Sequence, residues 1–308
     1  GCQISTYFPD RNLEGYGIST KAIDLASRSN QNLIIALDCG IKAHDQVNYA
    51  LEKEIEFIIC DHHNPDESIP NALAILNPKR KDCLYPFKEL CGCGVGFKLI
   101  QALELKINNK IDNIINYLDL VAIAIAADIV PLVGENRILA HIGIQIINSA
   151  PRIGINSLFK NRDKKEFNIG DLMFHIAPRI NAAGRIEHAK KAVEILVEQD
   201  LDRAKKLASF IEENNVTRRN LDQNITKEAL EMIDENKKST VVFSKNWHKG
   251  VVGIVASRVI ESHYKPTIVL AEKDGILTGS ARSVHDFDLY EAISKCAHLC
   301  EKFGGHKY

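Results

Sequence analysis

The sequence lacks any apolar run long enough to cross a membrane. None of its uninterrupted apolar stretches reaches the ~18 residues that a membrane helix needs, and its first residues show no signal-peptide pattern. Hydrophobic residues make up 45% of the chain and charged residues 26%, values that are ordinary for soluble globular proteins. The 308 residues are enough for about two domains.

An excess of charge is also missing, because the formal net charge is only -1. The chain therefore has no general attraction for nucleic acid, and any such binding must use a local basic patch or metal ions. The eight cysteines show no C-x2-C spacing of a zinc site. Cys296 and Cys300 share one face of a predicted helix, where we expect buried thiols. Unpaired thiols indicate a reducing, cytoplasmic environment.

Polar side chains follow two neighbouring predicted strands. The apolar runs 33–37 and 57–60 are typical of strands buried on both faces, and residues 43–53 predict a helix between them. Asp38 follows the first run, and the triplet 61–63, Asp-His-His, follows the second. Sites in open α/β sheets form beyond the carboxyl ends of the strands. Carboxylate oxygen and imidazole nitrogen are ligands for divalent metals such as Mn²⁺ or Mg²⁺.

A third acid follows a predicted buried helix. Residues 111–127 are increasingly apolar on all sides, which is typical of a buried helix, and Asp128 comes next. A buried carboxylate is costly unless it is paired or metal-bound, so we expect Asp128 to be a metal ligand. Earlier, residues 92–96 have the sequence Gly-Cys-Gly-Val-Gly before a predicted helix, 97–105. These glycines could present N–H groups to an anion or allow close helix packing, and the sequence leaves both interpretations open.

The remaining segments predict a long helix and a second α/β region. Residues 201–234 form an amphipathic stripe that is apolar at both ends and polar in the middle, as expected for a helix that crosses solvent between domains. A bend near 214–215 is the alternative. Strands are expected at 4–8, 72–76, 240–243, 267–270 and 276–281, with helices at 251–261 and 289–300. We expect a first domain at 1–198, a connecting helix at 199–236 and a second domain at 237–308.

Further motifs carry a family resemblance. They are Ala127–Leu132, Pro178–Arg185, Trp247–Gly253, Gly279–Ser283 and Gly304–His306. In this order, and together with the Asp-Cys-Gly and Asp-His-His motifs, they resemble the DHH phosphoesterase superfamily and, within it, the RecJ family. The resemblance covers nearly the whole chain. It implies an α/β fold, in which a DHH domain with a mainly parallel sheet is joined by a long helix to a smaller α/β DHH-associated domain.

The resemblance also implies an activity: metal-dependent 5′-to-3′ hydrolysis of single-stranded DNA, in DNA repair and recombination. Two divalent ions, Mn²⁺ or Mg²⁺, about 3.5–4 Å apart would make hydroxide and neutralise the developing charge. Asp38 would bridge the two ions, and His62 and Asp128 would complete the shell of one. His63 would contact the scissile phosphate. Asp61 would orient His62 or His63 by a hydrogen bond, without contacting a metal ion itself.

Small and basic residues of the later motifs are expected to hold the nucleic-acid strand, because arginine forks match phosphate oxygens. They are Arg179, Asn181 and Arg185 in a predicted loop, Ser280, Arg282 and Ser283, and His306. We expect a groove lined by Arg179, Arg185 and Arg282 that excludes duplex DNA. The alternative, in which the arginines cap helices or pair with acids, stays open.

One family motif, Asp-x-Asp-x-Asp-Gly, is not found. Only Asp10 and Asp24 precede Asp38, and neither has the pattern. We therefore expect an internal fragment with ligands for at most one weakly held ion and an exposed apolar slot in its sheet. Such a chain would be inactive and poorly stable alone. Two further functions remain open: a DHH relative that cleaves short oligonucleotides or phosphoadenosine nucleotides, and an inactive nucleic-acid-binding fragment.

Overall fold

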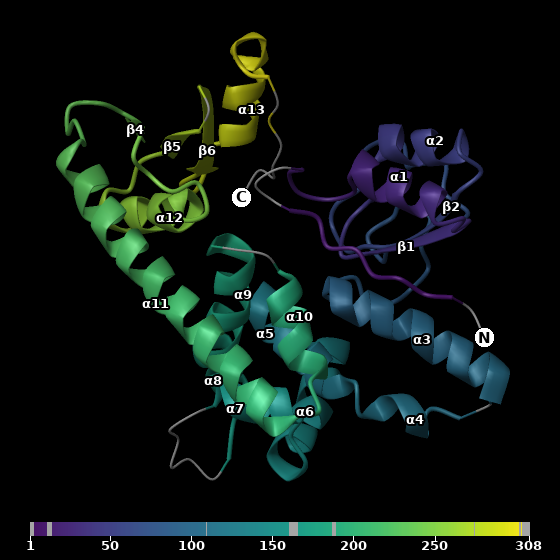
Figure 1. The fold of residues 1–308 in the computed structure, drawn as a ribbon. Helices are drawn as coiled ribbons and strands as arrows, with labels where there is room; N and C mark the ends of the chain where they lie inside the picture. The colour runs from purple at the N-terminus through teal and green to yellow at the C-terminus, as the bar shows by residue number, and fades with distance from the viewer. Residues whose placement is uncertain are drawn as a thin grey trace. The chain divides into compact units, whose positions relative to one another are not determined.

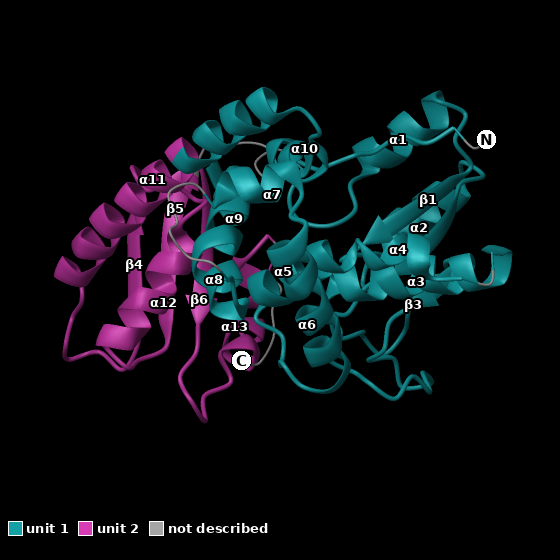
Figure 2. Ribbon diagram, turned by 90° about the horizontal axis from the view of Figure 1, so that it is seen from below, with its two compact units in different colours: residues 1–212 teal, residues 213–308 magenta. Residues whose placement is uncertain are grey.

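A computed structural model describes residues 3–10, 14–108, 110–159, 166–186, 189–273, 275–301 and 303. The chain divides into two compact units, Gly1–Glu212 and Glu213–Tyr308 (Figure 2). No helix in the part of the chain that the structure describes is both long and apolar enough to cross a membrane.

The first unit contains a parallel sheet whose strands are β1 (Leu33–Leu37), β2 (Glu56–Cys60) and β3 (Ala74–Leu76), in that order. Helix α2 (His44–Leu51) connects β1 to β2, and the side chain of Ser19 caps α1 (Thr20–Arg28). Helices α1 and α2 cover one face of the sheet and α3 the other (Figure 1). All three strands end at the same edge, as the sequence predicts. The predicted strand at 4–8 is wrong, because residues 3–10 form no strand.

Strand β1 is an edge strand in the described part of the chain, where it pairs with β2 alone. Its side chains alternate between the two faces, and Leu33, Ile35 and Leu37 are 41%, 48% and 58% exposed. The prediction that this strand is buried on both faces is therefore wrong, because one of its faces exposes apolar side chains.

Helices form the rest of the first unit. They are α3 (Gly92–Asn108), α4 (Asp112–Ile115), α5 (Leu118–Asp128), α6 (Gly134–Ser149), α7 (Ile153–Leu158), α8 (Ile169–Asp171), a π-helix (Leu172–Ile176), α9 (Ala177–Ile186) and α10 (Lys190–Val197). Helix α5 is the buried centre, and it packs so tightly on α6 that a Cβ on Gly143 would lie 2.1 Å from the Leu118 carbonyl oxygen. The predicted helix at 111–127 is thus split into α4 and α5.

Two local predictions in this unit need correction or completion. The expected loop at 178–185 is helical, because Ala182 and Ala183 are fully buried on the core, and this packing outweighs the weak helix propensity of Asn and Gly. The glycine-rich segment 92–96 belongs to α3 itself rather than to a loop before it. Because these glycines lie inside α3, close helix packing is favoured as their role.

Helix α11 (Leu201–Glu231) runs unbroken from the first unit into the second, so the bend near 214–215 is excluded (Figure 2). The second unit has strand β4 (Thr240–Ser244) parallel to β5 (Thr267–Lys273), which pairs antiparallel with β6 (Ile276–Arg282). Helices α12 (Val252–Ser262), α13 (Leu289–Ser294) and a 3₁₀ turn (Ala297–Leu299) complete it.

Three features of the second unit test the predictions. Asp222, in the polar middle of the α11 stripe, is 0% exposed and lies 2.8 Å from Arg258 Nη2 of α12, so this part of the helix does not cross solvent. Trp247 is buried, and its indole N–H donates to Glu228 Oε2 at 2.7 Å. Cys296 and Cys300 are exposed, which contradicts their expected burial, because the helix ends at Ser294 before reaching them.

Candidate metal centre

Asp38 leaves β1 in a strained conformation. Its φ of +62° lies in the left-handed region that residues with a Cβ rarely adopt. Its carboxylate packs against the first turn of α3, where a Cβ on Gly92 would lie only 2.0 Å from Asp38 Oδ1. A glycine is therefore required at position 92 if the Asp38 carboxylate is to occupy this place, a role that the sequence pattern did not reveal.

Asp61 is a buried anchor for the loop after β2. Its Oδ2 accepts the Ile41 N–H at 2.9 Å, and its Oδ1 accepts the N–H groups of His62 and His63 at 2.7 and 3.1 Å. His63 Nδ1 lies 2.6 Å from the same Oδ1. Burial alone would raise the pKa of Asp61, but the hydrogen bonds from His63 and Ile41 outweigh it and hold the pKa at about 2.

The Asp61 carboxylate also raises the pKa of His63, mainly through the hydrogen bond between them. This geometry agrees with the predicted role of Asp61 in orienting a histidine, here His63. The two rings of His62 and His63 lie edge to face, with centroids 4.6 Å apart. The loop therefore presents two imidazoles in fixed orientations at the carboxyl edge of the sheet.

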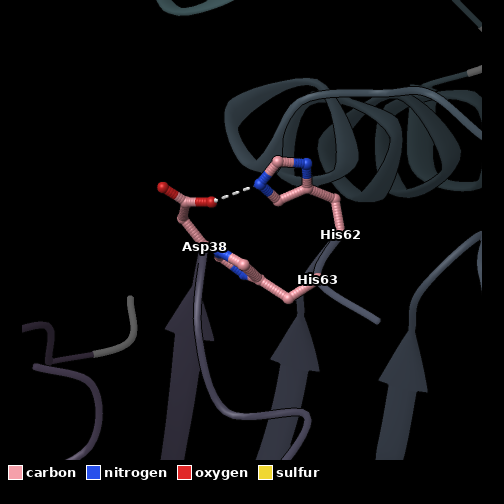
Figure 3. A group of neighbouring side chains, drawn as sticks. All are labelled: Asp38, His62 and His63. Carbon is pink, nitrogen blue, oxygen red and sulfur yellow. Dashed lines mark ion pairs between the residues drawn. The ribbon is translucent and has the colours of Figure 1, made fainter. Parts of the chain in front are cut away.

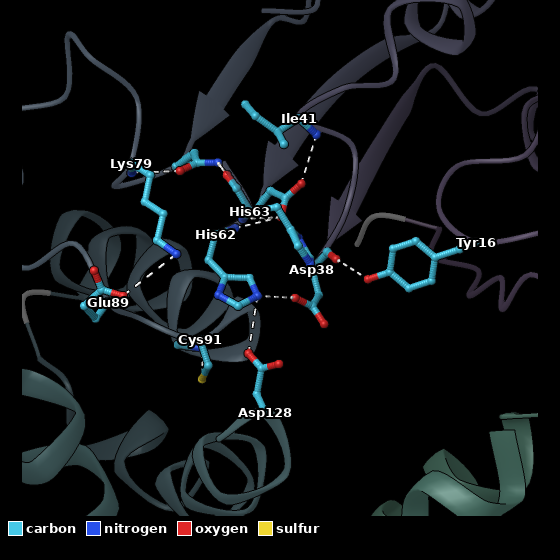
Figure 4. Close-up of polar contacts among 12 residues, drawn as sticks. Tyr16, Asp38, Ile41, His62, His63, Lys79, Glu89, Cys91 and Asp128 are labelled. Atoms are coloured by element: carbon cyan, nitrogen blue, oxygen red, sulfur yellow. Dashed lines mark hydrogen bonds and ion pairs between the residues drawn. The ribbon is translucent and has the colours of Figure 1, made fainter. Parts of the chain in front are cut away.

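His62 lies between two carboxylates from distant parts of the chain. Its Nε2 is 3.2 Å from Asp38 Oδ1 and 3.3 Å from Asp128 Oδ2 (Figures 3 and 4). Asp128 is the last residue of α5, and Ile129 ends that helix with a left-handed φ of +55°. Burial raises the pKa of Asp128, although the nearby charges of His62 and His63 oppose the shift. The sequence prediction that Asp128 joins the strand-end residues agrees with this arrangement.

The donor atoms fit a hard divalent cation. Asp38, His62 and His63 each offer a ligand atom within 4.8 Å of the others. Carboxylate oxygens around an imidazole Nε2 suit Mn²⁺ or Mg²⁺, and the buried Nδ1 of His62 has no acceptor among the described residues. Burial raises the pKa of each of the nearby thiols of Cys39, Cys60 and Cys91 to about 11, so they stay protonated and are poor ligands.

The predicted strand-binding residues are divided between the two units. Arg179 on α9 lies 2.5 Å from Glu212 Oε2 through Nε and donates from Nη1 to the His175 carbonyl, so the acid-pairing alternative describes this arginine. Asn181 and Arg185 lie on the same helix. His306 is outside the described residues.

Ser280 and Arg282 lie together on β6 of the second unit. Arg282 donates to Ser280 Oγ at 3.2 Å and to Ser257 Oγ of α12 at 3.1 Å. Close by, a Cβ on Gly253 would lie 3.2 Å from Ser280 Oγ. Ser283, in contrast, donates its hydroxyl to the carbonyls of Val284 and Phe287. Sequence reasoning missed Ser257, whose only signal is its position one helical turn after Gly253.

Comparisons with known proteins agree with this fold and site. Residues 1–125 match the DHH family, N-terminal domain, and residues 236–308 match the DHHA1 domain. Single-stranded-DNA-specific exonuclease RecJ of Bacillus subtilis is 40% identical over 99% of this chain and 39% of its own length. The proteins of the same name from Escherichia coli and Thermus thermophilus are 36% and 31% identical, over 57% and 44% of their lengths.

Solved structures agree as well. A crystal structure of exonuclease RecJ bound to manganese superposes with a TM-score of 0.82 at 30% identity, over 97% of this chain and 75% of that one. RecJ from Thermus thermophilus in complex with Mn²⁺ gives a TM-score of 0.83 at 30% identity, over 94% and 43%. The chain spans between 39% and 57% of these curated relatives. It belongs to the RecJ family of the DHH phosphoesterase superfamily.

Proposed function

We propose that the protein to which this chain belongs is a metal-dependent exonuclease that degrades single-stranded DNA from the 5′ end. The observation that carries the proposal is the position of His62, with its Nε2 within 3.3 Å of carboxylates from both Asp38 and Asp128. Relatives named single-stranded-DNA-specific exonuclease RecJ are described as specific for single-stranded DNA, and a crystal structure of a RecJ contains bound manganese. A role in DNA repair and recombination, in the cytoplasm, fits that activity.

Asp38, His62 and Asp128 would hold Mn²⁺ or Mg²⁺. Such an ion supplies a nucleophilic hydroxide near neutral pH and neutralises charge on the phosphate. His63, whose raised pKa favours the protonated ring, keeps Nδ1 toward Asp61 and has Nε2–H as a donor for a phosphate oxygen. Asp61 cannot take part directly, because it is 1% exposed and accepts four hydrogen bonds.

The second unit would contribute further contacts to the DNA backbone. Ser280 and Arg282, with Ser257, place hydroxyls and a guanidinium on one small surface, a combination suited to phosphate contacts. Asn181 and Arg185 would contribute from the first unit, and Arg179 would do so only by leaving its pairing with Glu212. The proposed division into a DHH domain (1–198), a connecting helix (199–236) and a DHH-associated domain (237–308) is supported by the unit boundary inside α11.

A nuclease assay tests the proposal. Single-stranded and duplex DNA, labelled at either end, are incubated with the protein and manganese, with a chelator and His62→Ala as controls. We expect degradation of single strands only, starting from the 5′ end and abolished by both controls. Equal cleavage of duplex, or activity that survives chelation, would contradict the proposal. A preference for strands of a few nucleotides would favour the small-substrate alternative.

A further inference from the structure

The third strand of the sheet also ends in a polar residue that faces the site. Asn77 directly follows β3 and is only 2% exposed. Its Nδ2 donates to the His63 carbonyl oxygen at 2.8 Å, and its Oδ1 accepts the Lys79 N–H at 2.8 Å. The buried amide of Asn77 therefore fixes the main chain of the Asp-His-His loop and that of Lys79 relative to each other.

The ammonium group of Lys79 has few partners within the described chain. Its side chain is 27% exposed, and the nearest carboxylate oxygen, Glu89 Oε2, lies 3.8 Å away, beyond hydrogen-bond range. Among the described residues the Lys79 Nζ has no hydrogen-bond acceptor. Figure 4 shows the Lys79 side chain extending along the side of the site where His62 lies. Three N–H donors thus remain available beside the metal centre.

A lysine in this place works against metal binding unless an anion is also present. A positive charge near a dication repels it, and Lys79 does not offset this by pairing with Asp38 or Asp128. A phosphate oxygen would be attracted by the ammonium and the metal together, and the cost of placing two cations close to one another would disappear. Within the described chain the ammonium has only the loose ion pair with Glu89 at 3.8 Å, which leaves its N–H donors for a bound phosphate.

We infer that Lys79 is a phosphate-binding residue of the metal centre. Its ammonium contacts a non-bridging oxygen of a backbone phosphate in single-stranded nucleic acid, and Asn77 is the positioning residue that fixes its place. The inference rests on the proposed function, because it assumes that a phosphodiester is the substrate held at this site.

The test compares Lys79→Met, Lys79→Arg and the matched control Lys81→Met, a neighbouring lysine that is exposed. Two quantities are measured on each whole chain: manganese affinity by calorimetry, and binding of a phosphorothioate oligothymidine to the manganese-loaded protein over a range of salt. For Lys79→Met we expect manganese to bind equally or more tightly and the oligonucleotide about 10- to 100-fold more weakly. The slope of log affinity against log salt should fall by about 0.7.

Lys79→Arg should recover most of the oligonucleotide affinity, and Lys81→Met should resemble the wild type in both measurements. Unchanged oligonucleotide binding and salt slope in Lys79→Met would overturn the inference, as would an equal loss of manganese affinity, which indicates a structural role. If the wild type binds oligonucleotide and manganese normally, these failures concern Lys79 alone. If the wild type binds neither, the proposed function fails and the inference fails with it.

Discussion

Asp61→Asn is the substitution whose effect the structure defines most closely. The hydrogen bonds at Asp61 lower its pKa from the ordinary 3.8 to about 2, so the charged form stabilises the fold by about 2–3 kcal/mol at neutral pH. An asparagine keeps one acceptor oxygen. If this oxygen stays with the histidines, its NH₂ group faces the Ile41 N–H, and an unsatisfied buried donor costs about 1–3 kcal/mol. We expect a loss of about 3 kcal/mol in the free energy of unfolding.

The free energy of unfolding should depend on pH with a definite sign for each of Asp61 and His63. Because the folded-state pKa of Asp61 is depressed, its stabilisation is complete above the ordinary pKa of 3.8 and is lost as the pH falls through about 2. The pKa of His63 is raised, so its stabilisation is complete below the ordinary 6.5 and is lost as the pH rises through the folded value. In Asp61→Asn both dependences should weaken, and the pKa of His63 should fall.

Urea unfolding of the metal-free protein between about pH 2 and pH 8, with NMR titration of the histidines, measures both effects. Asp66→Asn is the matched control, since Asp66 makes only an exposed pair with Lys42 at 2.7 Å and should contribute less than about 1 kcal/mol. If Asp61→Asn destabilises no more than this control and leaves the pKa of His63 unchanged, the role of Asp61 as a buried anchor is refuted.

The remaining predictions concern the metal. In the full-length protein, His62→Ala should leave the far-ultraviolet circular dichroism unchanged but abolish calorimetric manganese binding and nuclease activity; near wild-type cleavage would refute the assignment. Gly92→Ala should displace the Asp38 carboxylate and weaken manganese binding about 10- to 100-fold. Its control, Gly96→Ala, meets only Leu37 Cδ2 at 3.4 Å and should have little effect. Because burial raises the pKa of Asp128, an NMR titration of the metal-free protein should give this carboxyl a pKa above the ordinary 3.8, and a value at or below 3.8 would contradict this.

The sequence by itself determined the parallel sheet and the polar residues at the ends of its strands. Apolar runs of five and four residues flank an amphipathic helix, and this local pattern needs no tertiary information to predict a β-α-β unit. Since parallel strands end at one edge, Asp38 and the Asp-His-His loop had to meet. Asp128 was predicted for a different reason, as an acid that would be costly to bury after the wholly apolar run 120–127, although its side chain is 42% exposed in the structure.

Only the tertiary structure decided which residues pack against or hydrogen-bond to each polar group of the site. Pro178–Arg185 looks like a loop because Pro, Asn and Gly are weak helix formers, yet the burial of Ala182 and Ala183 makes it helical. The roles of Gly92 and Asn77 depend on contacts with residues that are 54 and 14 positions away, Asp38 and His63. Sequence periodicity reports which face of a helix or strand is buried, but long-range packing decides which other element covers that face. This packing places Asp38 against Gly92 and Lys79 beside the proposed metal ligands.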